Sequence, residues 1–271
     1  MAESGPDPVA TLVRDAAFDA YSAGLFAPAG ARPHLYALQA FDIELSRVRD
    51  LTREPLPGEM RFQWWRDALA DPARADAAAH PVMRALEAAI RYGALPRQAL
   101  QDLIDARNDD LYDDPLPTVG DLEARLGATR SALLRLSSLI LARGRDPGGA
   151  DAAGHGGLAL GLTQIARELS RAPQRVARLV PVELLAAQGV GQGDLERNEA
   201  PAALVAALRA LALRHLNAAR AAYPALDPVA APAFLPLALV ASDLTRRGPG
   251  DGLRWLRLAR LWRASRRSTP F

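Results

Sequence analysis

Residues 33–50 read PHLYALQAFDIELSRVRD, and their apolar spacing decides the fold. Apolar side chains recur there every three or four residues, the spacing of one helical face: Leu35, Leu38, Phe41, Leu45 and Val48. Residues 58–69 repeat the pattern with Phe62, Trp65 and Leu69. Both segments are therefore predicted to be amphipathic helices that bury one side.

The same period recurs along the rest of the chain, and no stretch alternates with the period of two typical of a strand. Asp7 and Pro8 have the residue types of a helix cap and a first helical position. Further helices are predicted at about 8–24, 81–92, 96–112, 118–143, 156–171, 181–188, 200–223, 229–247 and 251–267. The connections are short, so residues 1–271 are expected to form a single all-α domain.

The composition is ordinary for a globular protein with a full core: 49% hydrophobic and 24% charged residues among 271. The chain has no cysteine, which excludes disulfides and thiolate chemistry. The N-terminus lacks the basic and apolar regions of a signal peptide. No apolar run reaches the roughly 18 residues needed to cross a bilayer. A cytoplasmic protein is expected.

Charge is unevenly distributed along the chain. All 33 basic residues are Arg. Residues 163–271 hold sixteen Arg and eight acids, a net charge of +8, whereas residues 1–162 hold seventeen Arg and twenty-three acids, a net charge of −6. The C-terminal part is therefore expected to meet something acidic.

Residues 246–271 are predicted to form a basic amphipathic helix. Arg recurs every three residues, among apolar side chains that include two Trp, and such helices can lie in a lipid headgroup region. The expected membrane or partner-binding residues are Arg254, Trp255, Arg257, Arg260, Trp262 and Arg263. The alternative is that the apolar side closes the core while the Arg face is only solvated. Nucleic-acid binding is not expected, since no recognised module accompanies the Arg residues.

Familiar catalytic patterns are absent: the sequence has no HExxH, GxSxG or Walker loop. The four His lie far apart in sequence, so each is interpreted as an isolated residue. Residues 154–157, GHGG, are interpreted as a loop that leads into a helix N-terminus. A row of acids shares one helical face and is either a metal site or, the favoured interpretation, a solvated surface: Asp102, Asp105, Asp109 and Asp113.

Three stretches resemble one known family. They are LYALQAF at 35–41, GEMRFQWWRD at 58–67, and LALGLTQIARE at 158–168 followed by an Arg-rich turn and Val180-Pro181. They are similar, in this order, to squalene and phytoene synthases. The resemblance implies an all-α isoprenoid synthase fold. It also implies two acidic motifs on facing helices, whose carboxylates hold magnesium against the pyrophosphate that leaves a prenyl diphosphate.

Both acidic motifs are degenerate here. At the place of the first stand Asp42, Ser46 and Asp50. Ser46 replaces the leading Asp. Asp42 is expected two turns upstream of Asp50 on the same helical face, about 12 Å away, which is too far for one ion to bridge. At the place of the second stand Gln164, Arg167, Glu168 and Arg171. Arg and Ala replace its last two acids. No metal and no cofactor are therefore expected.

Charge repulsion supports this expectation. Arg residues that point into the former site would repel magnesium and pair with the remaining carboxylates. The hypothesis is that Asp50 or Glu168 faces Arg171 or Arg167 across the former cavity. An ion pair would then stand where a metal bridged.

Within the family, FDIELSRVRD at 41–50, EPLPGE at 54–59 and WWRDA at 64–68 are similar to one branch. That branch contains the mitochondrial assembly factor for respiratory complex I and its bacterial relatives. The resemblance implies a non-catalytic role in complex I assembly at the inner membrane, with complex I subunits or intermediates as partners. Two alternatives remain: a magnesium-dependent prenyltransferase that uses Asp50, Glu168 and the Asp105/Asp109 face, and a lipid-binding protein that uses the cavity.

Overall fold

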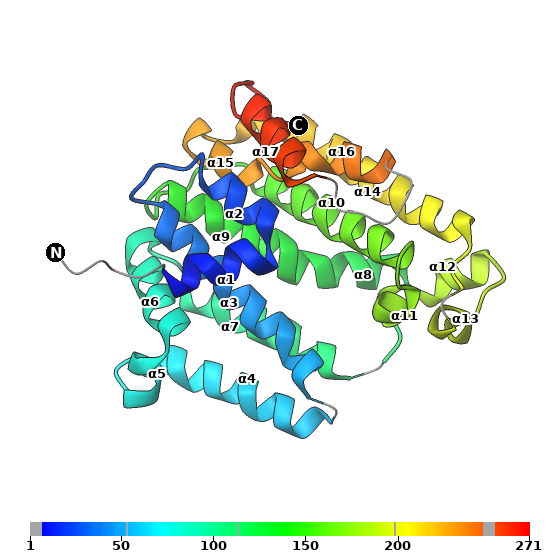
Figure 1. The fold of residues 1–271 in the computed structure, drawn as a ribbon, viewed down its shortest axis with the longest axis horizontal. Helices are drawn as coiled ribbons and strands as arrows, with labels where there is room; N and C mark the ends of the chain where they lie inside the picture. The colour runs from blue at the N-terminus through cyan, green and yellow to red at the C-terminus, as the bar shows by residue number, and fades with distance from the viewer. Residues whose placement is uncertain (1–6, 53, 113, 198, 246–252) are drawn as a thin grey trace. The chain divides into compact units, whose positions relative to one another are not determined.

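A computed structural model describes residues 7–52, 54–112, 114–197, 199–245 and 253–271. Every regular element within these ranges is a helix (Figure 1). The chain divides into two compact units, and the second begins at residue 113. Unit 1 comprises residues 1–112, 135–148 and 227–233, and unit 2 comprises residues 113–134, 149–226 and 234–271. That they form a single domain, as the sequence predicts, stays a prediction.

Unit 1 is built around α3, which runs from Arg32 to Leu51 and packs against α1 and α6. The predicted apolar stripe of α3 is confirmed, since all five of its side chains are buried. So are the three predicted apolar residues of α4, which packs on α7. The other helices of the unit are α1 (Pro8–Ala16), α2 (Phe18–Gly24), α4 (Pro55–Ala70), α5 (Ala75–Ala79), α6 (Pro81–Gly93) and α7 (Arg97–Asn108).

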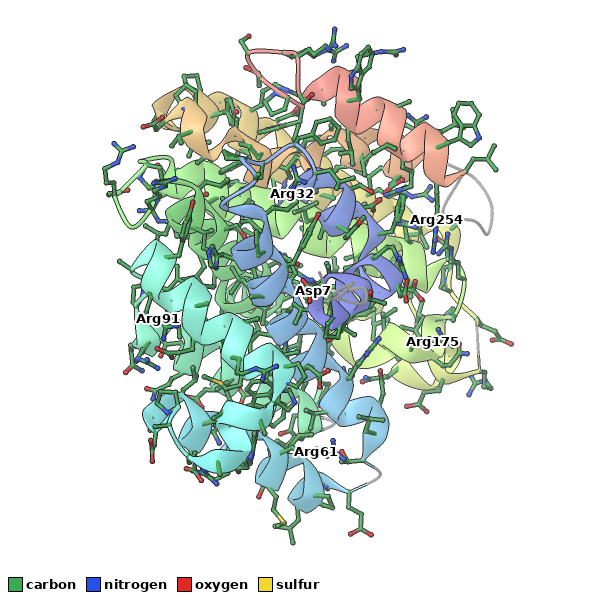
Figure 2. The ribbon with its side chains drawn as sticks, turned by 60° about the vertical axis from the view of Figure 1, so that its left-hand side comes forward. Asp7, Arg32, Arg61, Arg91, Arg175 and Arg254 are labelled. Carbon is green, nitrogen blue, oxygen red and sulfur yellow. The ribbon has the colours of Figure 1, made fainter. Side chains whose placement is uncertain are left out.

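The first predicted helix is interrupted. Asp7 caps α1 as predicted, because its Oδ1 accepts a hydrogen bond from the Val9 amide at 2.9 Å (Asp7 is labelled in Figure 2). At Ala17 the backbone leaves helical geometry, with φ −140° and ψ 60°, and α2 starts at the next residue. The apolar period continues across this break, which is why the sequence predicts one helix.

Unit 2 is centred on two long helices, α10 (Ala150–Leu169) and α14 (Ala202–Ala222), which pack along each other (Figure 1). The predicted helix 118–143 begins in this unit as α8 and a π-helical turn at Gly127–Ser131, and continues into unit 1 as α9. The other helices of unit 2 are α8 (Val119–Leu126), α11 (Pro173–Val176), α12 (Val182–Ala187), α13 (Gln192–Glu196), α16 (Leu237–Thr245) and α17 (Arg254–Ala264). Most residues of α9 (Ala132–Leu141) and α15 (Ala231–Phe234) belong to unit 1.

Two segments are long and apolar enough to cross a membrane by length and composition: Ala202–Ala225 and Pro228–Thr245. Neither segment was predicted from the sequence. The first consists of α14 and one 3₁₀ turn, and α14 packs against α10. A core helix of a soluble protein passes the same test, so these segments are weak indications of membrane insertion.

The Gly-rich stretch 154–157 is not the predicted loop, because it lies inside α10. Its glycines allow close packing against the π-helical turn. A Cβ on Gly157 would stand 2.3 Å from both the backbone N and the Cα of Ser131. The Ser131 hydroxyl also donates a hydrogen bond to the Gly154 carbonyl at 2.6 Å. Helix–helix approach, and not turn formation, therefore explains this stretch.

We expect Gly157→Ala to lower the free energy of unfolding by about 1–3 kcal/mol, since the obstructing atoms belong to backbone that cannot rotate away. Gly154→Ala is the matched control. A Cβ at Gly154 meets no atom within 4 Å, so the better helix propensity of Ala should raise stability by up to about 1 kcal/mol. Urea denaturation of both variants measures the difference. Equal stabilisation by the two substitutions would contradict the close approach.

Candidate functional site

Asp42, from the first degenerate motif, forms a buried ion pair in unit 1. Its Oδ1 lies 2.6 Å from Nη2 of Arg107, which comes from α7. The two side chains are only 5% and 12% exposed. Asp110, just after α7, approaches Arg107 Nη1 at 3.4 Å, and its carbonyl accepts a hydrogen bond from Arg49 at 2.7 Å. Asp42 is thus neutralised by a guanidinium from a different helix.

Burial and charge act in opposite directions on Arg107. Burial by itself lowers the pKa of Arg107, but Asp42 and Asp110 more than offset this effect, so the pKa is raised above its ordinary value. The guanidinium therefore stays charged. A carboxylate held by such a cation is a poor magnesium ligand, because the ion would have to displace the guanidinium and bear its repulsion.

The other two positions of the first motif have a different environment. Ser46 donates a hydrogen bond to the Ile43 carbonyl within α3, at 3.0 Å. Asp50 lies near the end of α3 and is exposed, whereas Asp42 is buried. The expectation that Asp42 and Asp50 share one face is therefore wrong. Eight residues at about 100° each leave the two side chains some 80° apart around the helix axis.

Arg167, from the second degenerate motif, belongs to a buried network in unit 2. Its Nη1 lies 3.3 Å from Oδ2 of Asp243 on α16. Arg257 of α17 donates two hydrogen bonds to the same carboxylate, from Nη1 to Oδ1 at 2.7 Å and from Nη2 to Oδ2 at 2.8 Å. Asp243 and Arg257 are 6% and 4% exposed in their side chains. This network ties α10, α16 and α17 together.

Asp243 was not predicted as a site residue, although the sequence contains a signal for it. Asp243 is the one acid in the apolar segment 229–247, and a lone acid in such a helix marks a buried charge that needs a partner. Which partner it would find is set by packing and is not visible in the spacing.

Glu168 and Gln164, also from the second motif, have Arg partners of their own. Glu168 lies 3.9 Å from Arg171, one turn along the chain. Gln164 accepts a hydrogen bond from Arg130 at 2.9 Å. The hypothesis paired Glu168 with Arg171 or Arg167 across a cavity. Glu168 does lie near Arg171, but the two residues are three positions apart, within one turn of the chain. The pairing of Asp50 in that hypothesis stays a prediction.

The described residues do not fit the magnesium ions that the fold family uses. A magnesium site needs several carboxylates close together, and neither motif supplies them. Asp42 is paired with Arg107, and Glu168 has Arg171 beside it. Across the ranges that the structure describes, no three His, Cys, Asp or Glu side chains are placed to hold a metal ion. The predicted acidic face is also interrupted: α7 ends at Asn108, Asp105 pairs with Arg66 at 2.6 Å, and Asp113 lies outside the described residues.

Two His residues that were interpreted as isolated meet in unit 2. Nδ1 of His155 on α10 lies 3.0 Å from Nδ1 of His215 on α14. Nε2 of His215 lies 3.1 Å from Oε1 of Glu123 on α8. An ionised carboxylate only accepts hydrogen bonds, so a neutral His215 beside an ionised Glu123 donates from Nε2 and accepts at Nδ1 from His155. The three side chains link three helices.

The C-terminal helix, α17, differs from the prediction in one residue and in length. Arg257 is 3% exposed and bound to Asp243, so its assignment to a membrane or partner-binding face is corrected. Four Arg at steps of three residues advance by about 300° each, and so spread over half the helix circumference. The helix spans Arg254–Ala264, and residues 246–252 of the prediction lie outside the described residues.

The remaining predicted residues of α17 face outward or take part in local contacts. Arg254 and Arg263 are exposed, as are Trp255 and Trp262. Arg260 is half-buried and donates a hydrogen bond to the Ser242 hydroxyl at 3.0 Å. Figure 2 labels Arg254 at the first turn of α17.

Comparison with solved structures confirms the predicted all-α fold. A dehydrosqualene synthase is similar with a TM-score of 0.73 and 18% identity, over 95% of this chain and 93% of that one. The squalene synthase HpnC from Alicyclobacillus acidocaldarius is similar with a TM-score of 0.71 and 21% identity, over 87% and 90%. At these identities the likeness establishes the fold alone.

Relatives matched by sequence have a higher sequence identity to this chain than these solved structures. The NADH dehydrogenase (ubiquinone) complex I assembly factor 6 of Rattus norvegicus is 31% identical over 227 residues, which are 83% of this chain and 68% of the relative. The Homo sapiens protein of the same name is 30% identical over the same lengths. The Drosophila melanogaster homologue is 29% identical over 195 residues, 70% of this chain and 58% of that protein.

The family model described as squalene/phytoene synthase matches residues 13–263, nearly the whole chain. Together with the shared fold, this match confirms the resemblance predicted from the motifs. The chain belongs to the squalene/phytoene synthase family.

Proposed function

We propose that this protein performs no prenyl transfer and acts in the assembly of respiratory complex I, as a cytoplasmic protein peripheral to the inner membrane. The observation that carries the proposal is the buried pair between Asp42 and Arg107. It places a cation against an acid of the first motif. The names of the relatives that are about 30% identical supply the biological setting.

The second motif supports the same proposal. Prenyl transfer needs magnesium to neutralise a departing pyrophosphate, and hard cations need several oxygen ligands. Glu168 is the one acid left at that motif, and Arg171 lies beside it. Two guanidinium groups, those of Arg167 and Arg171, stand on the same stretch of α10 and its following turn. They would oppose a divalent ion there.

We expect the purified protein to release no pyrophosphate from farnesyl or geranylgeranyl diphosphate in the presence of magnesium. The reason is that the degenerate motifs cannot hold the ions that ionise the substrate. A catalytically competent squalene synthase, assayed in parallel, is the positive control. Turnover that Asp50→Ala abolishes would establish the prenyltransferase alternative instead.

Whether the motif acids are needed for function can also be tested in cells, with a substitution that leaves the buried networks intact. Deleting the gene should lower the NADH-oxidising activity of membranes and leave isoprenoid levels unchanged. The double variant Asp50→Ala/Glu168→Ala should restore that activity fully, since it removes the other two motif acids without touching Asp42 or Asp243. If this variant accumulates normally and still fails to complement, the motif acids have a function and the non-catalytic proposal is wrong.

A further inference from the structure

The helix α17 has an inner face that is buried and an outer face that is exposed and apolar. Its inner face consists of Arg257, Leu261 and Ala264, which are buried in unit 2. Its outer face carries Trp255, Leu258 and Trp262, which are 63%, 38% and 49% exposed. Their spacing of three and four residues places them in one stripe along the helix. The inner face already closes the core, so this stripe is not needed for it.

Large apolar side chains that stay exposed to water do not gain the free energy of burial. Full burial of one such side chain stabilises by about 1.5–3 kcal/mol. Trp combines a broad apolar ring with one N–H donor, which suits a layer that is apolar on one side and wet on the other. The stripe therefore has the chemistry of an interfacial surface and not of a dry core.

The surroundings of the stripe are cationic. Arg254 and Arg263 are exposed on the helix, and Arg266 and Arg267 are exposed just after it. The Arg266 guanidinium lies over the Trp262 ring, 4.1 Å from its centroid. Residues 253–271 contain no Asp or Glu.

We propose that the outer face of α17 binds the headgroup layer of an anionic membrane, with Trp255, Leu258 and Trp262 inserted between lipids and the flanking Arg on phosphate groups. A basic helix with Trp on its apolar side lies in the interface plane in this way. Lipid phosphates match the guanidinium groups in charge and geometry. The inference rests on the proposed function for its biological setting, but its test needs no complex I.

The full chain is mixed with vesicles of phosphatidylcholine alone, or of phosphatidylcholine with phosphatidylglycerol, and floated on a density gradient. We expect binding to the anionic vesicles, a blue shift of Trp fluorescence, and release as salt screens the charges. Trp255→Ser/Trp262→Ser should weaken binding about tenfold or more, since two buried rings are lost. Arg263→Gln/Arg266→Gln should weaken it about tenfold, and only for anionic vesicles.

Two control variants separate this face from general stickiness. Leu56→Ser/Met60→Ser removes apolar residues of unit 1 that are 65% and 68% exposed, and should leave binding unchanged. Arg61→Gln/Arg175→Gln removes two exposed Arg, both labelled in Figure 2, and should also have no effect. Equal losses in test and control variants would overturn the proposal. Failure of the wild-type protein to float with anionic vesicles would also overturn it, and would leave the assembly role to the deletion experiment.

Discussion

Asp243→Ala is expected to lower the free energy of unfolding by about 3–5 kcal/mol, the cost of breaking a buried pair by removing one partner. Asp243 is the shared acceptor of Arg257 and Arg167, and Arg257 is 4% exposed. Without the carboxylate, Arg257 would be left as a desolvated cation. Such a loss is a large part of the roughly 5–15 kcal/mol that holds a typical domain together. Urea denaturation followed by circular dichroism measures it.

A compensating variant tests the reason for that loss. Asp243→Leu/Arg257→Met replaces both members of the buried pair by apolar side chains of similar size. It is expected to recover most of the stability, because the buried cation is removed together with its carboxylate. Arg167 also loses Asp243, but its side chain is 23% exposed and stays in contact with water. A double variant as unstable as Asp243→Ala would mean that lost packing, and not an unpaired Arg257, causes the effect. A loss below about 1 kcal/mol in Asp243→Ala itself would contradict the buried network.

Asp42→Ala is expected to cost about 3 kcal/mol, at the lower end of the range for buried pairs. Arg107 would keep one partner, Asp110, at 3.4 Å, and so would not be wholly uncompensated. The same change removes an acid of the first motif. Since Arg107 already neutralises that acid, the substitution should not alter magnesium binding measured by calorimetry.

The chain offers a matched control for Asp42. Asp105 forms a pair with Arg66 at the same distance, 2.6 Å, but its side chain is 60% exposed. Asp105→Ala should cost less than about 1 kcal/mol, because water screens exposed pairs and solvates the freed Arg. If the two substitutions had equal effects, the burial assigned to the pair between Asp42 and Arg107 would be wrong.

The buried carboxylates Asp42 and Asp243 both pair with Arg residues that are distant in sequence. Asp42 meets Arg107 from a helix 65 residues later, and Asp243 joins Arg167 with Arg257. Asp42 pairs with one guanidinium, and Asp243 pairs with two. These pairs stabilise the helices on which the degenerate motifs lie, whatever those motifs do.

The sequence by itself determined the helices and the family. The apolar period of α3 and α4 predicted their buried residues, because a helix that packs on one side must repeat every three or four positions. The cap at Asp7 was predicted from residue types alone, since capping is a local interaction. The degeneracy of the acidic motifs is predicted from the residue types at their positions, and it stays a prediction.

Only the tertiary structure decided which charges meet, which Arg of α17 turns inward, and why Gly157 is a glycine. Periodicity reports the apolar side of one helix, but it carries no information about the side chain that another helix brings to it. The environments of Asp42, His155 and Arg257 were misjudged for this reason. Gly157 shows the same limit, since a close approach between two backbones is a property of their packing and leaves the same letter in the sequence as a turn.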